Sequence, residues 1–193
     1  FVAIPRESFK DAFKEFVQYV DEKGLKHGLC LSTTIHDMNE ALEMNGLNGY
    51  WMTKDLQEFE RIVYDEPERK VILCGSRALF QGIDIHGLEF VCLNKIPFPN
   101  YDEKQQKMNE FLQDKAGIDS WGGFTVPKTQ NDMLQSSGRL WRDVDSHGVV
   151  SCFDPRVEKF QYMFKYVFCE YRNGINMLIK RGPRSKDEPW EFD

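Results

Sequence analysis

Two arginines and a glutamine recur at helical spacing in the second half of the chain. Gln135, Arg139 and Arg142 stand at positions i, i+4 and i+7, so in one continuous helix they share one exposed face, beside Gly138. Arginine is the usual residue where phosphate is bound by two parallel hydrogen bonds. A solvated charged face normally mixes acids with bases, but residues 133–142 contain no acid. The spacing therefore predicts a site for a polyanion.

A second segment combines glycines with a single carboxylate. Gly82 and Gly87 stand five residues apart, and Asp84 lies between two isoleucines in an otherwise apolar setting. Glycine allows a ligand to approach the backbone closely, so this segment could lie against a bound molecule. The alternative is an ordinary turn in which Asp84 acts as a cap.

Three hydroxyl side chains end the first short apolar run. Ser32, Thr33 and Thr34 follow residues 29–31. Hydroxyls and free backbone amides at the end of a strand can hydrogen-bond phosphate oxygens. Serine and threonine are also common helix N-caps, and taken alone these residues favour the capping role.

Helices and strands alternate along the chain. The predicted helices cover residues 9–23, 36–44, 56–63, 102–116, 131–142 and 157–171, and the predicted strands cover residues 29–31, 47–51, 71–74, 89–93, 148–153 and 175–179. Short, continuously apolar strands between helices are typical of a mostly parallel sheet that is covered on both faces. In such a sheet, ligands collect at the carboxyl ends of the strands. The sequence therefore predicts one α/β domain over residues 1–193.

Two further segments could suggest other assignments. Residues 119–127 contain Trp121, two glycines and a proline, so a loop is predicted there. Residues 62–66 resemble a metal-binding acidic strand, but Pro67 follows them and the preceding pattern is helical, so they are predicted to end a helix. Trp121 and the pair Tyr50-Trp51 could stack on bases, although packing in the core or in a loop is the simpler role.

Composition excludes several classes of protein. The chain is 41% apolar and 29% charged, with fifteen Phe residues that must be buried, so it is an ordinary folded domain. No stretch approaches the roughly 20 apolar residues of a membrane span, so no membrane partner is expected. The net charge of −6 argues against a protein that coats nucleic acid, but it leaves room for a local basic strip.

The cysteines and histidines give no metal-ligand or disulfide spacing. The five cysteines are odd in number, never closely paired, and mostly set in apolar runs, which is typical of reduced core cysteines in a cytoplasmic protein. The four histidines share no spacing that would suit a metal. No metal site is therefore expected in this chain.

In their order along the chain, these segments resemble motifs IV, V and VI of superfamily 2 helicases, in the DinG/XPD-like branch. The matching segments are Ser32-Thr33-Thr34, Phe80-Gln81-Gly82-Ile83-Asp84 and Gln135-x-x-Gly138-Arg139-x-x-Arg142. Many members carry Glu where this chain has Gln81. Two flanking features of the family also occur, Lys-Ile-Pro-Phe-Pro at residues 95–99 and Asp-Pro-Arg at residues 154–156. The resemblance covers about residues 28–156.

The resemblance implies the second, C-terminal RecA-like motor domain of an ATP-dependent DNA helicase that moves 5′→3′ along single-stranded DNA. ATP and Mg²⁺ would lie between it and a first RecA-like domain of the same parent chain. The resemblance gives Arg139 and Arg142 the role of fingers at the γ-phosphate and Gln135 that of its sensor. It places Gly82, Asp84 and Gly138 at the nucleotide. Contacts to the DNA strand would come from Ser32, Thr33, Thr34, Ser76 and Arg77.

Parts of the motor are missing from the sequence. It contains no Gly-Lys-Ser/Thr, so the P-loop would belong to a first motor domain that precedes Phe1 in a longer chain. It also lacks the four clustered cysteines of the iron–sulfur domain that some members of the family carry, so no such cluster is expected here. The fragment alone is therefore predicted to be inactive.

Two alternatives stay open at this level. A non-catalytic nucleic-acid-binding or assembly module could keep the RecA-like fold without the motor, although two retained arginines in motif VI count against it. A DinG-like protein joined to a nuclease, or to a larger repair or defence complex, would carry the same residues.

Overall fold

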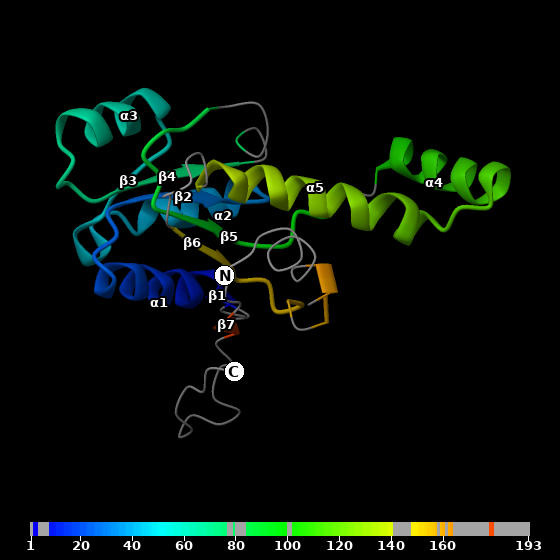
Figure 1. The fold of residues 1–193 in the computed structure, drawn as a ribbon, viewed down its shortest axis with the longest axis horizontal. Helices are drawn as coiled ribbons and strands as arrows, with labels where there is room; N and C mark the ends of the chain where they lie inside the picture. The colour runs from blue at the N-terminus through cyan, green and yellow to red at the C-terminus, as the bar shows by residue number, and fades with distance from the viewer. Residues whose placement is uncertain are drawn as a thin grey trace, which may run out of the picture.

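In the computed structural model, a parallel sheet is flanked by helices on both faces (Figure 1). The structure describes residues 2–3, 8–76, 79, 84–99, 102–140, 148–157, 159–160, 162–163 and 178–179. Arg77, Gly82 and Arg142 lie outside the described residues, as does most of the helix predicted over residues 157–171. No helix in these described ranges combines the length and the apolar character needed to cross a bilayer.

Every strand pairing in the described sheet is parallel. The strands are β1 (Val2–Ala3), β2 (His27–Leu31), β3 (Trp51–Thr53), β4 (Val71–Gly75), β5 (Phe90–Leu93), β6 (Val149–Cys152) and β7 (Leu178–Ile179). Their order across the sheet is β3-β4-β2-β5-β6-β1-β7. The predicted α/β class with a parallel sheet is confirmed, whereas β1 was not expected from the sequence.

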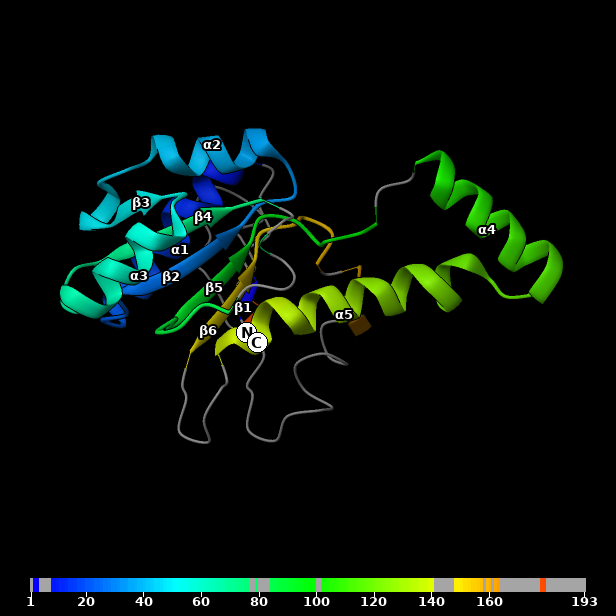
Figure 2. The same ribbon diagram turned by 90° about the horizontal axis from the view of Figure 1, so that it is seen from above.

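The helices are α1 (Phe9–Glu22), α2 (Ile35–Glu43), α3 (Leu56–Asp65), α4 (Glu103–Ala116) and α5 (Val126–Ser137). Side-chain caps begin three of them, supplied by Ser8, Thr34 and Asp55. Figures 1 and 2 show α4 and the outer part of α5 extending away from the sheet as an arm. Residues 62–66 include the end of α3, so their resemblance to an acidic strand is coincidental, as predicted.

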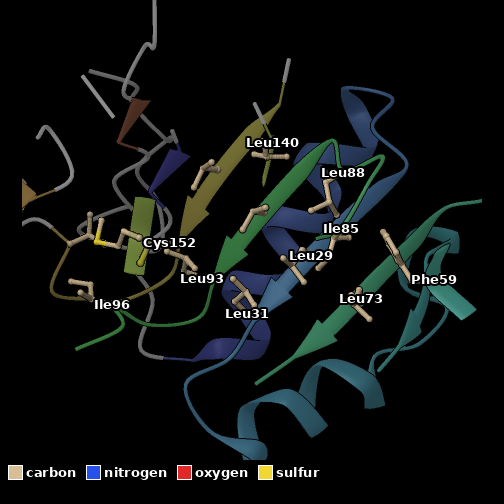
Figure 3. Packing of buried hydrophobic residues seen from close by; sticks show 14 of the residues in the cluster. Leu29, Leu31, Phe59, Leu73, Ile85, Leu88, Leu93, Ile96, Leu140 and Cys152 are labelled. Carbon is tan, nitrogen blue, oxygen red and sulfur yellow. The ribbon is translucent and has the colours of Figure 1, made fainter. Parts of the chain in front are cut away.

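Two apolar clusters cover the two faces of the sheet. Alternate residues of each strand point to opposite faces, so Leu29 and Leu31 of β2 pack on α3, while Cys30 packs on α1. Figure 3 shows the first cluster, with Phe59 of α3 beside Leu73 of β4. On the other face, Phe16 of α1 packs edge-on against the ring of Phe90, 5.7 Å between centroids. The sheet is thus a rigid support for the loops at its two edges.

Four cysteines lie in this core as free thiols, as predicted: Cys30, Cys74, Cys92 and Cys152. Burial raises the pKa of the Cys152 thiol well above its usual value, so this thiol stays neutral. Cys169 lies outside the described residues.

The strand predicted over residues 47–51 is wrong. Leu47–Gly49 is a 3₁₀ turn, η1, and the strand β3 begins only at Trp51. The reason is local, because Gly46, Asn48 and Gly49 all have positive φ values of 90°, 49° and 80°, which no β-strand can accommodate.

The loop predicted over residues 119–127 is also wrong. Trp121–Thr125 forms a π-helical turn, η3, that runs directly into α5. Pro127 lies in the first turn of α5, directly after the π-helical turn in which the Val126 N–H donates to the carbonyl of Trp121. The helix predicted over residues 131–142 therefore starts five residues earlier, at Val126. It ends at Ser137 and is followed by the 3₁₀ turn η4 (Gly138–Leu140).

Candidate nucleic-acid and nucleotide interfaces

A cleft of about 780 Å³ opens near the carboxyl ends of β5 and β6. Three segments distant in sequence form it, one after β5, one from η3, and one after β6. The lining residues are Phe98, Pro99, Trp121, Thr125, Arg156, Lys159, Phe160 and Tyr162. Aromatic rings and two cations therefore share one cavity.

The aromatic rings of the cleft contact one another. Phe98 and Phe160 meet edge to face with their centroids 5.2 Å apart, and Trp121 lies 5.6 Å from both. Trp121 is 41% exposed and Tyr162 is 49% exposed, whereas Phe160 is nearly buried. Phe160 thus joins the cleft to the core, and the exposed faces of Trp121 and Tyr162 are available to a planar ligand.

A buried carboxylate fixes one cation of the cleft. Asp154 is 1% exposed and accepts hydrogen bonds from Nε and Nη2 of Arg156, at 2.9 and 2.8 Å, and from the backbone N–H of Ile96 at 3.0 Å. Burial opposes ionisation of Asp154, but the hydrogen bonds from Arg156 and Ile96 outweigh it and hold the pKa of the carboxyl below its ordinary value. The guanidinium of Arg156 is thereby held beside the aromatic rings.

Ser32 and Thr33 follow β2 at the same edge of the sheet. The sequence left open whether their backbone amides are free, and in the structure both have acceptors. The Ser32 N–H donates to the carbonyl of Gly75 at 2.8 Å, and the Thr33 N–H donates to Oδ1 of Asn94 at 2.9 Å. Ser32 is fully buried, while Thr33 is half-buried. A phosphate at this loop would meet the side chain of Thr33 rather than backbone amides.

Thr34 has the capping role that the sequence left open. It is the N-cap of α2, and its Oγ1 accepts from the Asp37 N–H at 3.1 Å. The same hydroxyl donates to the Asp37 carboxylate at 2.7 Å. Thr34 is nevertheless exposed, at the rim of the loop. Ser76 follows β4 and is half-buried at the same edge.

Asp84 does not lie in an apolar setting, contrary to the prediction. Its side chain is 63% exposed, with Oδ2 3.3 Å from Nε2 of His86. Its neighbour Ile85 is fully buried in the cluster that includes Phe59 of α3. The isoleucine therefore anchors the segment to the core, and the anchoring leaves the carboxylate in solvent.

Gln135 and Arg139 do not share an exposed face, so that prediction is also wrong. Gln135 is exposed on α5, whereas Arg139 is only 8% exposed. The physical reason is the tighter 3₁₀ turn at Gly138, which changes the rotation per residue that the spacing argument assumed. Gly138 itself faces open space, so no contact within the described residues requires glycine there.

The guanidinium of Arg139, in the turn η4 after α5, is incompletely hydrogen-bonded. Its Nη1 is buried and has no hydrogen-bond partner among the described residues. Burial lowers the pKa of the guanidinium, because the charged form is removed from water. A buried guanidinium with an unpaired nitrogen is destabilising unless an anion pairs with it.

The cleft and Arg139 lie at opposite edges of the sheet. Gly148 directly precedes β6, and a Cβ atom added to it would lie 3.1 Å from the side chain of Leu140 and 2.8 Å from the carbonyl of Glu89. Leu140, the neighbour of Arg139, therefore lies at the amino end of β6. Figure 3 shows Leu140, Leu88 and Ile85 at this end and Leu31 and Leu93 at the other. One helix, α5, leads from η3 at the cleft to η4 at Arg139.

Sequence reasoning assigned no role to most residues of the cleft. Phe160 was covered only by the helix predicted over residues 157–171, and Arg156 was noted only within Asp-Pro-Arg. The available signal was the presence of aromatic and basic residues after two adjacent parallel strands.

A family model described as the helicase C-terminal domain matches residues 7–167. The ATP-dependent helicase DinG of Mycobacterium tuberculosis is 34% identical over 94 residues, which are 47% of this chain and 14% of that protein. The 3′-5′ exonuclease DinG of Staphylococcus epidermidis is 30% identical over 95 residues, 48% of this chain and 10% of that protein. The chain thus spans a small part of the length of these relatives.

Solved helicase structures share the fold. An apo XPD structure matches 92% of this chain and 39% of its own, with a TM-score of 0.65 at 13% identity. The C-terminal domain of the DEAD-box protein Dbp5 matches 93% of this chain and 87% of its own, with a TM-score of 0.53 at 14% identity. The fold is that of a RecA-like helicase domain.

Proposed function

We propose, from the premise that this chain belongs to the helicase C-terminal domain family, that it is the second motor domain of an ATP-dependent DNA helicase of the DinG type. Residues 1–193 would form one domain that works with a first RecA-like domain of the same, cytoplasmic parent chain. The cleft of aromatic rings and cations at the carboxyl edge of the sheet is the observation that carries this proposal.

The cleft suits single-stranded DNA. Every base has a flat π-face, and stacking on an aromatic side chain contributes about 1–3 kcal/mol per base without selecting a sequence. Trp121 and Tyr162 offer exposed rings, and Arg156 and Lys159 offer positive charge for phosphates beside them. We propose that the rest of the strand track follows the same edge past Thr33, Thr34 and Ser76. Ser32 is fully buried and would support this loop rather than touch the strand, and a contact from Arg77 stays an expectation of the family resemblance.

The other edge suits a nucleotide phosphate. The buried Nη1 of Arg139 has no hydrogen-bond partner among the described residues, and a γ-phosphate presented by the first motor domain would supply one. Arg142 and Gln135 would act beside it, with Gly82, Asp84 and Gly138 at the same nucleotide. As the family resemblance implies, Mg²⁺ would be held mainly by the first domain.

This division of roles favours a motor over a non-catalytic module. A module that only binds nucleic acid has no use for a buried arginine whose Nη1 has no partner in the described part of the chain, because such a charge is destabilising. In a motor, the same arginine stabilises the charge that develops during phosphoryl transfer. The helix α5 would connect the two edges, so that nucleotide state and strand contact change together.

Photo-crosslinking tests the strand assignment. Single-stranded DNA carrying 5-iodouracil is irradiated with the chain, and the modified peptides are identified by mass spectrometry. We expect crosslinks at Trp121 and Tyr162. Tyr64 is the control, since it is 88% exposed on α3 and far more accessible than either. Crosslinking that follows exposure, with Tyr64 modified first, would refute the cleft as the strand site.

Direction and catalysis need the full-length parent. Unwinding of duplexes that carry either a 5′ or a 3′ single-stranded tail, with ATP and Mg²⁺, tests the 5′→3′ polarity that the family resemblance implies. We expect unwinding only from the 5′ tail. Unwinding from the 3′ tail alone would reverse the assignment.

A further inference from the structure

Asn94 joins two loops at the carboxyl edge of the sheet. It follows β5 directly and is 3% exposed, and its backbone N–H donates to the carbonyl of Leu31 at 3.0 Å. Its side-chain Oδ1 accepts the Thr33 N–H at 2.9 Å, and its Nδ2 donates to Oδ2 of Asp37 at 2.6 Å. One carboxamide therefore fixes both the backbone of the Thr33 loop and the first turn of α2.

Asp37 is the acceptor on which these contacts converge. Its Oδ2 receives hydrogen bonds from Thr34 Oγ1 at 2.7 Å, from Asn94 Nδ2 and from Lys95 Nζ at 3.2 Å. Burial opposes ionisation of Asp37, but the hydrogen bonds from Thr34, Lys95 and Asn94 outweigh it and hold its pKa below the ordinary value. The carboxylate thus also fixes the ammonium group of Lys95 beside the loop.

The same strand end continues into the aromatic cleft. Two residues after Asn94, the Ile96 N–H donates to Asp154, which holds Arg156 over the ring of Phe98. Hydrogen bonds at both ends and the backbone of residues 94–96 between them therefore link the Thr33 loop to the cleft. A strand bound along this edge would meet two contact regions that are fastened to each other.

We propose that Asn94 and Asp37 are positioning residues for single-stranded DNA. They hold the Thr33 loop in the conformation that accepts the strand and keep this loop at a fixed position relative to the cleft. The proposal rests on the proposed function of this edge. Neither residue needs to touch DNA, since each acts through Thr33, Thr34 and Lys95.

Exchanging the two side chains provides the test. Asn94→Asp places two carboxylates face to face and should lower the affinity for a fluorescein-labelled oligothymidylate by about tenfold, the size expected for losing one buried, charge-assisted hydrogen bond. Asp37→Asn should lower it less, because an amide oxygen can still accept. The double variant Asn94→Asp/Asp37→Asn restores a carboxylate–amide pair with reversed direction. The amide nitrogen then stands where Oδ2 accepted from Thr34 and Lys95 and cannot accept from them, so the double variant should recover only part of the affinity lost in Asn94→Asp.

A control separates positioning from general loss of stability. Ile62→Val removes one methylene from the core under α3, away from the loop, and should leave the affinity unchanged while lowering the melting temperature. Rescue in the double variant supports the proposal. If Trp121→Ala weakens binding but Asn94→Asp does not, or if the double variant is as weak as Asn94→Asp, the positioning role is wrong and the strand site stands. If no variant at this edge changes binding, both are wrong.

Discussion

Arg156 lies over the ring of Phe98, with its guanidinium carbon 5.2 Å from the ring centroid. The two residues come from loops after different strands, and Asp154 holds the guanidinium in place with two hydrogen bonds. A cation that is already ordered loses little side-chain entropy when a ligand arrives. This wall of the cleft is therefore preorganised for a ligand, and variants of neighbouring residues of the cleft can test which ligand it binds.

Trp121→Ala should weaken binding of the chain to oligothymidylate by about tenfold or more, because stacking of one base on an aromatic ring contributes about 1–3 kcal/mol. Fluorescence anisotropy at low salt measures the change. Trp51→Ala is the matched control, since Trp51 is 37% exposed but lies on the edge strand β3, beside Arg69. Equal losses in the two variants would contradict the assignment of the cleft.

Lys159→Gln should reduce the dependence of binding on salt. Its Nζ lies 5.5 Å from the centroid of Phe160 in the cleft, and each phosphate contact on a single strand contributes about 0.7 to the slope of log K against log salt. Lys23→Gln is the control, because its ammonium lies in the same way over Tyr19, outside the cleft. An unchanged slope for Lys159→Gln would remove this residue from the strand site.

Asp154 should make the stability of the chain depend on pH in the acid range. Its pKa in the folded state lies below the ordinary value of 3.8, so its contribution is complete above that value and is lost as the pH falls through the lower, folded-state pKa. Urea unfolding of wild type and of Asp154→Asn over this range measures the difference. We expect the difference in the free energy of unfolding between wild type and Asp154→Asn to shrink below about pH 4, near the unfolded-state pKa of an aspartate. A difference that stays constant down to about pH 2 would contradict this contribution.

Local patterns were sufficient to predict most helices and strands. The periodicity of Phe13, Phe16 and Val20 predicted α1, and the apolar run at residues 71–74 predicted β4. The pattern misled where backbone conformation mattered more, as at Asn48 with its positive φ. It also misled at Arg139, because residue spacing defines a common face only when the helix is continuous.

The cleft of aromatic rings and cations could not be predicted in the same way. Phe98, Trp121 and Phe160 lie far apart in sequence, and they meet because β5 and β6 are neighbours in the sheet and η3 runs back over their ends. Sheet order is a global property that no single window contains. The motif residues, in contrast, were proposed from residue type and spacing, but this reasoning did not predict that Arg139 is buried or that Asp84 is exposed.

The chain alone should not hydrolyse ATP. Phosphoryl transfer in this class of motor needs a P-loop lysine and a metal-holding acid, and the sequence contains no Gly-Lys-Ser/Thr. Phosphate release is measured with and without single-stranded DNA, and no DNA-stimulated turnover is expected. Arg139→Ala serves as the control for contaminating enzymes. DNA-stimulated turnover that Arg139→Ala abolishes would contradict this prediction.

Arg139→Met in the full-length parent should remove most of the DNA-stimulated ATPase. An arginine that reaches the γ-phosphate stabilises charge that develops in the transition state, so turnover should fall much more than ATP affinity. Arginine fingers contribute about 10³–10⁵ in rate, although redundancy with Arg142 could reduce each single loss. We expect Arg142→Met to act in the same direction.

The burial of Arg139 adds a second, independent readout to this experiment. Replacing a buried cation that has an unpaired nitrogen by an apolar side chain of similar length should leave the chain at least as stable as wild type in a thermal melt. Arg61→Met on α3 is the control, since Arg61 is exposed and pairs with Glu66. The expected combination is lost ATPase with unchanged or raised melting temperature for Arg139→Met, and neither effect for Arg61→Met. If Arg139→Met instead melts well below wild type, the guanidinium stabilises the fold. If the folded variant also keeps more than about a tenth of the wild-type ATPase, the role of Arg139 as a finger at the γ-phosphate is refuted.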